Sequence, residues 1–261
     1  MKLLIKTVII VYVLICMLAY ILQDKIILQP HKVYEEEIYT KGQEIEIPIA
    51  DNLTMNCLYI KSKTPSKGVV LYFHGNKGNI FRATYQSRMV QDKGYDVLIP
   101  DYRGYGKTEG KVWSDNDLLP DADQAYRFLM TMYEEKDIYI MGYSLGSGMA
   151  SYVASVHNPA HLFLIAPFTS LVDIKNQYAW FLPDFLMRIV LPVEDFMQNV
   201  SCPVSIIHGT NDTVVDYKYS EELKSEFPDV KLITSEGQSH RRIIFDPLLK
   251  EELHRVLLRN N

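Results

Sequence analysis

A serine, an aspartate and a histidine occur in this sequence in an order that suits nucleophilic acyl transfer. Ser144 stands at the centre of Gly-Tyr-Ser-Leu-Gly, at residues 142–146, and Asp212 and His240 each follow a later apolar run. A serine hydroxyl is a poor nucleophile until a histidine takes its proton, and the histidine needs an acid that orients its ring. Ser144, His240 and Asp212 are therefore predicted to be nucleophile, base and acid.

Other residues compete for the roles of acid and base. Asp173 and Asp216 are lesser candidates for the acid, and Asp212 itself has the alternative interpretation of a turn residue or helix cap. The other histidines are expected at the surface, in the N-terminal linker, in the last helix or in turns at strand ends: His31, His74, His157, His161, His208 and His254. His240 remains the best base because it follows the last predicted strand.

Acyl transfer also needs N–H donors for the negative charge that develops on the carbonyl oxygen. In a strand–turn–helix nucleophile loop, the residue after the serine supplies one backbone donor, and here it is Leu145. The second donor comes from a loop after an earlier strand. Asn76, in His-Gly-Asn at residues 74–76, is the best placed residue for it. The alternative interpretation is an ordinary glycine-rich turn.

These side chains are far apart in the sequence, so they require a fold that brings their loops together at one edge of a sheet. The pattern of apolar residues predicts such a fold. Apolar runs of strand length occupy residues 44–49, 53–60, 68–73, 95–100, 138–141, 162–166, 203–208 and 230–234. Helical patterns occupy about 81–93, 117–135, the residues after 146, 217–227 and 246–258. Strands that alternate with helices predict an α/β fold with a mostly parallel sheet covered on both faces. The first two runs are expected to form a hairpin.

Residues 169–198 interrupt this alternation with an apolar insertion that contains two prolines, Pro183 and Pro192. The segment is long enough for one or two short helices. It has two interpretations: a cap that lines an acyl pocket, or a helix that covers the core. Loops at the C-terminal edge of such sheets carry binding sites, which favours the cap.

The chain begins with an apolar segment, residues 3–22, that is interrupted only by Lys6. About twenty apolar residues can cross a bilayer as a helix, and no small-residue cleavage site follows them, which favours an uncleaved signal-anchor. The alternative is a buried core helix. Lys2 and Lys6 predict a cytoplasmic N-terminus and an extracytoplasmic catalytic domain. Residues 23–42 are predicted to be a linker, and residues 43–261 the catalytic domain.

Composition narrows the function further. The 261 residues carry a net charge of −5, which argues against nucleic acid as a partner. The cysteines, Cys16, Cys57 and Cys202, form neither a zinc-binding spacing nor a disulfide framework. The proposed chemistry implies no metal and no organic cofactor. The sequence leaves the oligomeric state open.

Taken together, these motifs resemble the alpha/beta-hydrolase superfamily, and within it the small membrane-anchored serine hydrolases called alpha/beta-hydrolase-domain proteins. The resemblance covers residues 44–260 and rests on motifs in the family's order at residues 74–79, 101–106, 142–146, 208–212 and His240. Gln-Ser-His-Arg at residues 238–241 departs from the Gly-His-Asn/Asp surroundings usual for the histidine. The cap is also short, which resembles esterases and thioesterases more than large-lidded lipases.

The sequence thus predicts a serine hydrolase that cleaves carboxylic esters or thioesters through an acyl-enzyme. Ser144 in the nucleophile loop argues against haloalkane dehalogenases and epoxide hydrolases, which carry Asp at that position. A peptidase or amidase of the same fold is one alternative, and a non-catalytic binding protein is another. The N-terminal anchor favours a small-molecule or lipid-like acyl substrate held near a membrane.

Overall fold

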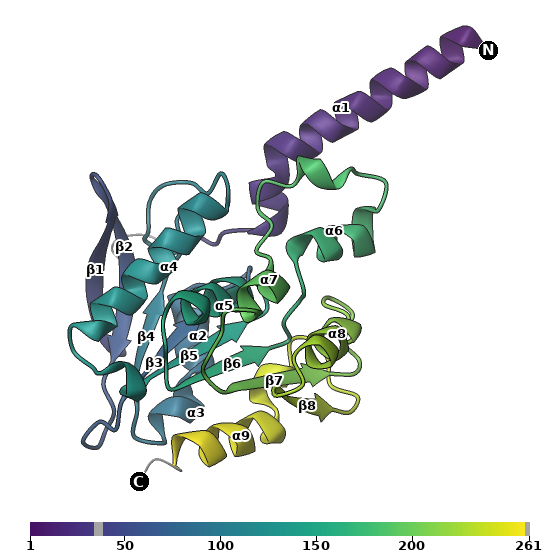
Figure 1. Ribbon diagram of the computed structural model, residues 1–261. Helices are drawn as coiled ribbons and strands as arrows, with labels where there is room; N and C mark the ends of the chain where they lie inside the picture. The colour runs from purple at the N-terminus through teal and green to yellow at the C-terminus, as the bar shows by residue number, and fades with distance from the viewer. Residues whose placement is uncertain (34–38, 259–261) are drawn as a thin grey trace.

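The computed structural model describes residues 1–33 and 39–258. Residues 34–38 of the predicted linker, and residues 259–261 of the predicted catalytic domain, lie outside the described residues. One eight-stranded sheet forms the centre of the molecule, with helices on both of its faces and the first helix projecting from one end (Figure 1). The predicted α/β class is confirmed.

Every apolar run predicted to be a strand forms one. The order across the sheet is β1-β2-β4-β3-β5-β6-β7-β8. The β1–β2 hairpin is antiparallel and β2 pairs antiparallel with β4, whereas every pair from β4 through β3 to β8 is parallel. The strands are Gln43–Ala50, Leu53–Ile60, Val69–Phe73, Asp96–Pro100, Ile138–Tyr143, His161–Ile165, Val204–Gly209 and Lys231–Ser235, in chain order. Because β3 to β7 are covered on both faces, their continuous apolar sequences are buried throughout.

Two apolar cores lie on opposite faces of this sheet. Helices α4 (Asp115–Met130), α5 (Gly146–Val156) and α8 (Lys218–Glu226) pack over one core. Helices α2 (Ile80–Gln86), α3 (Arg88–Gln91) and α9 (Pro247–Leu257) pack over the other. The helix predicted at 81–93 is divided at Ser87, and α4 ends before residue 135, where the short 3-10 helix η1 (Glu135–Asp137) begins. Both cores hold the sheet rigid beneath the loops that carry the site.

The insertion at residues 169–198 combines its two predicted interpretations. Its last helix, α7 (Val193–Met197), packs on α5 and covers the core. Its first part, α6 (Leu171–Ala179) and the 3-10 helix η2 (Asp184–Leu186), stands away from the sheet beside the first helix (Figure 1). We call residues 171–191 the cap.

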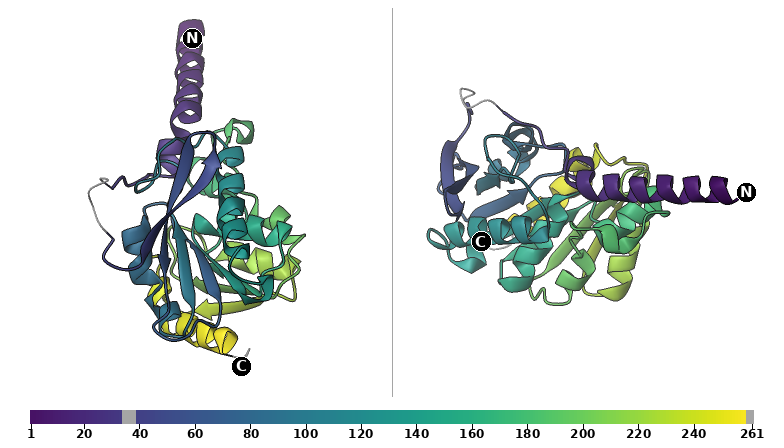
Figure 2. Two further views of the ribbon diagram at one scale, coloured as in Figure 1. Left: turned by 90° about the vertical axis from the view of Figure 1, so that its left-hand side faces the viewer. Right: turned by 90° about the horizontal axis from the view of Figure 1, so that it is seen from above.

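Helix α1 runs from Lys2 to Ile27 and projects from the domain (Figure 2). Among the helices of the described residues, α1 alone is long and apolar enough to cross a membrane, with a mean hydropathy of 2.5 over its most apolar window. The helix contains the predicted segment 3–22 and continues past it, so residues 23–27, predicted as linker, are helical. Most of α1 is exposed, but Gln23 near its end is buried.

Candidate active site

Ser144 lies in a sharp turn between β5 and α5, with a backbone φ of +52°. A non-glycine residue in this region is strained, and such strain persists only where the surroundings enforce it. Two glycines make the turn possible. A Cβ on Gly142 would lie 2.6 Å from the Cβ of Ala150, and one on Gly146 would lie 2.1 Å from the carbonyl oxygen of Phe73. The turn therefore presents the Ser144 hydroxyl above the edge of the sheet.

The structure brings the three predicted catalytic residues into one hydrogen-bonded chain. Ser144 Oγ lies 2.9 Å from His240 Nε2, and His240 Nδ1 lies 2.6 Å from Asp212 Oδ2. Asp212 and His240 come from the loops that follow β7 and β8, and these strands are adjacent in the sheet. The loops are joined where the Asn211 N–H donates to the carbonyl oxygen of Gln238 at 3.0 Å. Adjacent strand ends thus set the spacing of acid and base.

Asp212 is held as a carboxylate by its neighbours. Burial alone would raise its pKa, but hydrogen bonds from His208 and His240, together with backbone N–H groups, hold the pKa well below its usual range. The N–H groups of Val214 and Val215 each donate to Oδ1 at 2.9 Å. An ionised Asp212 accepts the Nδ1 proton of His240, which leaves the lone pair on Nε2 facing the Ser144 hydroxyl.

His208 is a second partner of Asp212, although its sequence context predicts only a turn residue at a strand end. Its Nε2 lies 3.2 Å from Asp212 Oδ2 and 3.0 Å from the carbonyl oxygen of Val215. Because both neighbours are acceptors, Nε2 carries the proton, and Nδ1 accepts from the Ser220 hydroxyl at 2.6 Å. The one available signal was the spacing of four residues between His208 and Asp212 beyond a strand end.

Tyr143, the residue before the nucleophile, supports the base. Its ring stacks on His240 with 5.3 Å between ring centroids, and its hydroxyl donates to the His240 carbonyl oxygen at 2.8 Å.

The other two candidate acids lie elsewhere. Asp173 accepts from Ser170 at the start of α6, and Asp216 accepts from the N–H of Lys218 at the start of α8.

The loop after β3 places Asn76 beside Ser144, as the sequence predicts. Asn76 and Leu145 both line the cavity into which Ser144 faces. In the described part of the chain, neither backbone N–H donates to a protein acceptor. The Asn76 side chain donates from Nδ2 to the carbonyl oxygen of Ile27 at 3.0 Å, and the Tyr102 hydroxyl donates to the His74 carbonyl oxygen at 2.7 Å. The loop is therefore fixed from both sides while the Asn76 N–H stays available.

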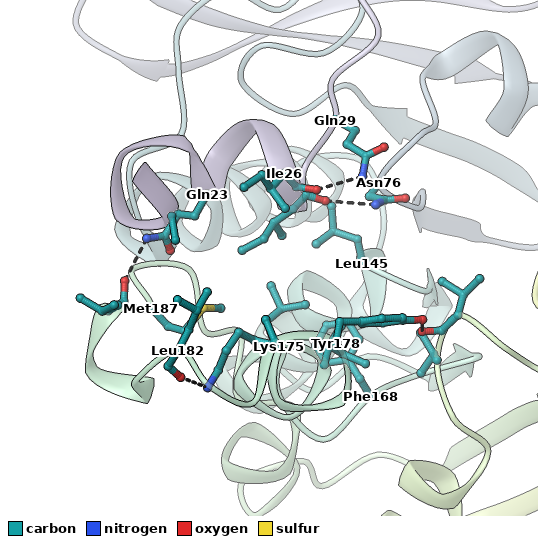
Figure 3. Close-up of a pocket in the computed structure, with 18 of the residues that line it drawn as sticks. Gln23, Ile26, Gln29, Asn76, Leu145, Phe168, Lys175, Tyr178, Leu182 and Met187 are labelled. Carbon is teal, nitrogen blue, oxygen red and sulfur yellow. Dashed lines mark hydrogen bonds between the residues drawn. The ribbon is translucent and has the colours of Figure 1, made fainter. Parts of the chain in front are cut away.

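Two cavities of different chemistry meet at Ser144. The larger has a volume of about 440 Å³ and lies between α1 and the cap (Figure 3). Its lining is mostly apolar and includes Leu145 and Phe168, and Lys175 is the one amine among the described lining residues. The smaller, of about 170 Å³, lies on the His240 side. Its lining includes three cationic residues, Lys77, Arg82 and Arg241.

An eight-stranded sheet in this order, with a strained serine between β5 and α5, defines an alpha/beta-hydrolase. The chain belongs to the family described as serine aminopeptidase, S33, whose model matches residues 64–194. That match contains Asn76 and Ser144 and ends before Asp212.

Similar proteins include hydrolases from several organisms. The chain is 30% identical to lysophosphatidylserine lipase ABHD12 of zebrafish over 187 residues, which is 63% of this chain and 48% of that protein. It is 26% identical to mouse alpha/beta hydrolase domain-containing protein 17C, over 72% of this chain and 59% of that protein. The chain thus spans about half of these relatives. The Pyrococcus furiosus esterase Pf2001 has the same fold, with a TM-score of 0.70 at 23% identity over 88% of this chain and 96% of that one.

Proposed function

We propose that this protein is a serine hydrolase that cleaves carboxylic esters of apolar acids through an acyl-enzyme, with thioesters as a second substrate class. Ser144 Oγ forms a bond to the acyl carbon while its proton passes to His240 Nε2. The tetrahedral intermediate then collapses, and His240 gives that proton to the departing alcohol or thiol. Water, deprotonated by His240, attacks the acyl-enzyme and releases the acid and free Ser144.

The observation that carries this proposal is the chain of contacts from Ser144 through His240 to Asp212, at 2.9 and 2.6 Å. An ionised Asp212 stabilises the imidazolium that forms during attack. The backbone N–H groups of Leu145 and Asn76 are the proposed donors to the oxyanion. Donors that are fixed before the reaction cost no reorganisation when charge develops, which makes them effective in a site that excludes water.

The cavities favour a substrate with an apolar acyl group. The larger cavity is within the range of about 300–1,000 Å³ that is typical of small-ligand sites. The activities named for similar proteins agree with an acyl ester, since one relative is a lysophosphatidylserine lipase and a structural neighbour is an esterase. An acyl chain in the larger cavity leaves the smaller one for the alcohol.

The family description also raises an aminopeptidase, and the charges near Ser144 argue against it. Such an enzyme needs an acidic group to bind the substrate's ammonium. Neither cavity has Asp or Glu in its described lining. Lys77, Arg82 and Arg241 form no ion pair among the described residues, so the smaller cavity repels a cation. It suits a neutral or anionic leaving group.

The test is covalent labelling of the full chain, in detergent, with a fluorophosphonate probe. We expect Ser144 to be labelled and short-chain esters to be hydrolysed, and Ser144→Ala to abolish both. Ser147→Ala is the matched control, because Ser147 follows Ser144 by three residues and its hydroxyl is buried without a hydrogen-bond partner among the described residues. Labelling that persists in Ser144→Ala contradicts the proposal.

We also infer that α1 anchors the enzyme in a membrane as a single span, with the catalytic domain on the extracytoplasmic side. The length and hydropathy of α1 support the span, and Lys2 and Lys6 at its start support a cytoplasmic N-terminus. Protease treatment of sealed vesicles tests the orientation: protection of the catalytic domain in cytoplasm-out vesicles is expected, and its digestion there contradicts the inference.

A further inference from the structure

The last turns of α1 are joined to the cap by a buried glutamine. Gln23, which is 5% exposed, donates from Nε2 to the carbonyl oxygen of Leu186 at 2.9 Å. Its Oε1 accepts from the N–H of Arg188 at 2.7 Å. A buried amide that is satisfied in this way is costly to separate from its partners. These bonds therefore fix the position of α1 relative to the cap.

Further contacts extend this junction along the helix. The Arg188 guanidinium donates to the carbonyl oxygen of Tyr20 at 2.9 Å and lies 3.5 Å from the centroid of the Trp113 ring. Farther toward the N-terminus, the Tyr12 hydroxyl donates to the carbonyl oxygen of Phe181 at 2.8 Å. At about 1.5 Å per residue, Tyr12 lies ~22 Å along the helix from Ile27. The hydrogen bonds between α1 and the cap thus reach from Gln23 back to Tyr12.

The C-terminal end of α1 reaches the catalytic loops themselves. The Ile27 carbonyl oxygen accepts from the side chain of Asn76, whose backbone N–H is a proposed oxyanion donor. The next carbonyl, of Leu28, accepts from the hydroxyl of Tyr105, and Leu28 is 3% exposed. Carbonyl groups at a helix C-terminus lack intrahelical partners, so they are free to accept such bonds.

Between these contacts lies the larger cavity, and α1 forms one of its walls. Figure 3 shows Gln23 and Ile26 on the helix side and Lys175, Leu182 and Met187 on the cap side. Ala19 and Ile27 complete the helix wall, and Ser144 and Leu145 also line the cavity. Ile26 is 59% exposed, although it borders the cavity. Residues of α1 therefore form one side of the apolar volume that Ser144 also lines.

We propose that the C-terminal part of α1, from Ala19 to Ile27, belongs to the active site: it forms the wall against which a long acyl chain lies, and its terminal carbonyl positions the oxyanion loop. This inference rests on the proposed ester hydrolysis. Each methylene that the wall buries raises kcat/KM about fourfold, from the transfer free energy of a methylene. The structure thus predicts a preference for long acyl chains that depends on α1.

The exposed surfaces around the cavity suit an acyl chain that already lies in a bilayer. The N-terminal half of α1 exposes apolar side chains, and the neighbouring cap exposes Trp180 (79%) and Phe185 (84%). Aromatic side chains are frequent at the membrane–water interface. A single-chain membrane lipid is accordingly the substrate class that we assign to this cavity.

The experiment narrows the cavity without removing the helix. Ile26→Trp in the full-length enzyme, in detergent micelles, places bulk in the cavity, and the matched control Lys25→Trp adds the same bulk at the exposed neighbouring position. The measurement is kcat/KM for p-nitrophenyl dodecanoate and acetate. Because several buried methylenes are displaced, we expect Ile26→Trp to lower the dodecanoate-to-acetate ratio by about tenfold or more. Lys25→Trp should leave the ratio within about twofold.

The outcomes separate the two proposals. An unchanged ratio in Ile26→Trp, with Ser144 labelled by fluorophosphonate as in the unmodified enzyme, overturns the role of α1 and leaves ester hydrolysis standing. Labelling that persists in Ser144→Ala refutes the proposed function, and the inference with it. Slow labelling in Ile26→Trp indicates misfolding, and the decision then passes to Ala19→Leu. This variant narrows the same cavity from another turn of α1. A lowered dodecanoate-to-acetate ratio then supports the inference, and an unchanged ratio overturns it.

Discussion

The substitution Asp212→Asn tests the electrostatic reasoning about the site. Asp212 accepts the N–H groups of Val214 and Val215 on Oδ1, and both His208 and His240 lie on Oδ2. In an asparagine, the oxygen can keep the two backbone N–H groups while the NH₂ takes the place of Oδ2. The His208 Nε2–H then keeps only the Val215 carbonyl oxygen as its acceptor. His240 Nδ1 then faces a donor and must accept. The imidazole proton moves to Nε2, where it points at Ser144.

A base that already carries a proton on Nε2 takes none from the serine. We therefore expect kcat/KM for ester hydrolysis to fall about 10⁴-fold, the loss reported for the corresponding change in a serine protease, which is about 5 kcal/mol of transition-state stabilisation. The fluorophosphonate labelling rate should fall in parallel, because labelling also needs a deprotonated Ser144. Folding should persist, since the asparagine oxygen keeps both backbone hydrogen bonds.

Asp216→Asn is the matched control, because Asp216 lies on the same loop and accepts only from the N–H of Lys218 among the described residues. It should retain activity within about threefold. The reasoning is refuted if Asp212→Asn keeps a tenth or more of the activity, or if the control loses as much as Asp212→Asn.

Three further substitutions test other parts of the structure. Asn76→Ala keeps the backbone N–H but loses the bond to Ile27, so kcat should fall about tenfold for acetate and dodecanoate alike, with KM little changed; a loss confined to dodecanoate contradicts this. Arg241→Gln should lower kcat/KM by about two- to fivefold for esters with a phosphate-bearing alcohol, most at low salt, and an equal loss for neutral alcohols argues against a charge effect. Burial opposes ionisation of Glu252, but Arg255, Lys231 and Ser205 lower its pKa to about 2 from the ordinary 4.5, so its stabilisation is complete above pH 4.5 and is lost as the pH falls toward 2. Glu252→Gln should therefore lower the unfolding free energy by about 3 kcal/mol at pH 7 in denaturant titrations, and a deficit that persists at pH 2 refutes this account.

The parts of the structure that the sequence predicts are those with local signals. Buried parallel strands are continuous apolar runs, so all eight strands are predictable, and the carboxyl ends of β5, β7 and β8 then place Ser144, Asp212 and His240 at one edge. The strained backbone of Ser144 also has a local signal, in the glycines on either side.

Other contributions depend on partners far along the chain, which no local pattern encodes. His161 was expected at the surface, yet it is 5% exposed and lies 2.9 Å from Ser205. The sequence predicts His208 only as a turn residue, but in the structure its loop brings Asp212 and Val215 to the same ring nitrogen, Nε2. The insertion is likewise divided by tertiary contacts, since α7 packs on α5 whereas the cap is bonded to α1.

Gln23 shows most clearly how a local pattern and a tertiary contact diverge. A polar residue directly after twenty largely apolar ones is typical of the end of a membrane-spanning segment, and the predicted linker begins there. In the structure, that glutamine is buried and bonded to backbone groups more than 160 residues away. A helix that served only as an anchor would need no such bonds. If the docked position of α1 matters, replacing α1 with a foreign transmembrane segment of equal length and hydropathy will keep the enzyme on the membrane but remove its preference for long acyl chains.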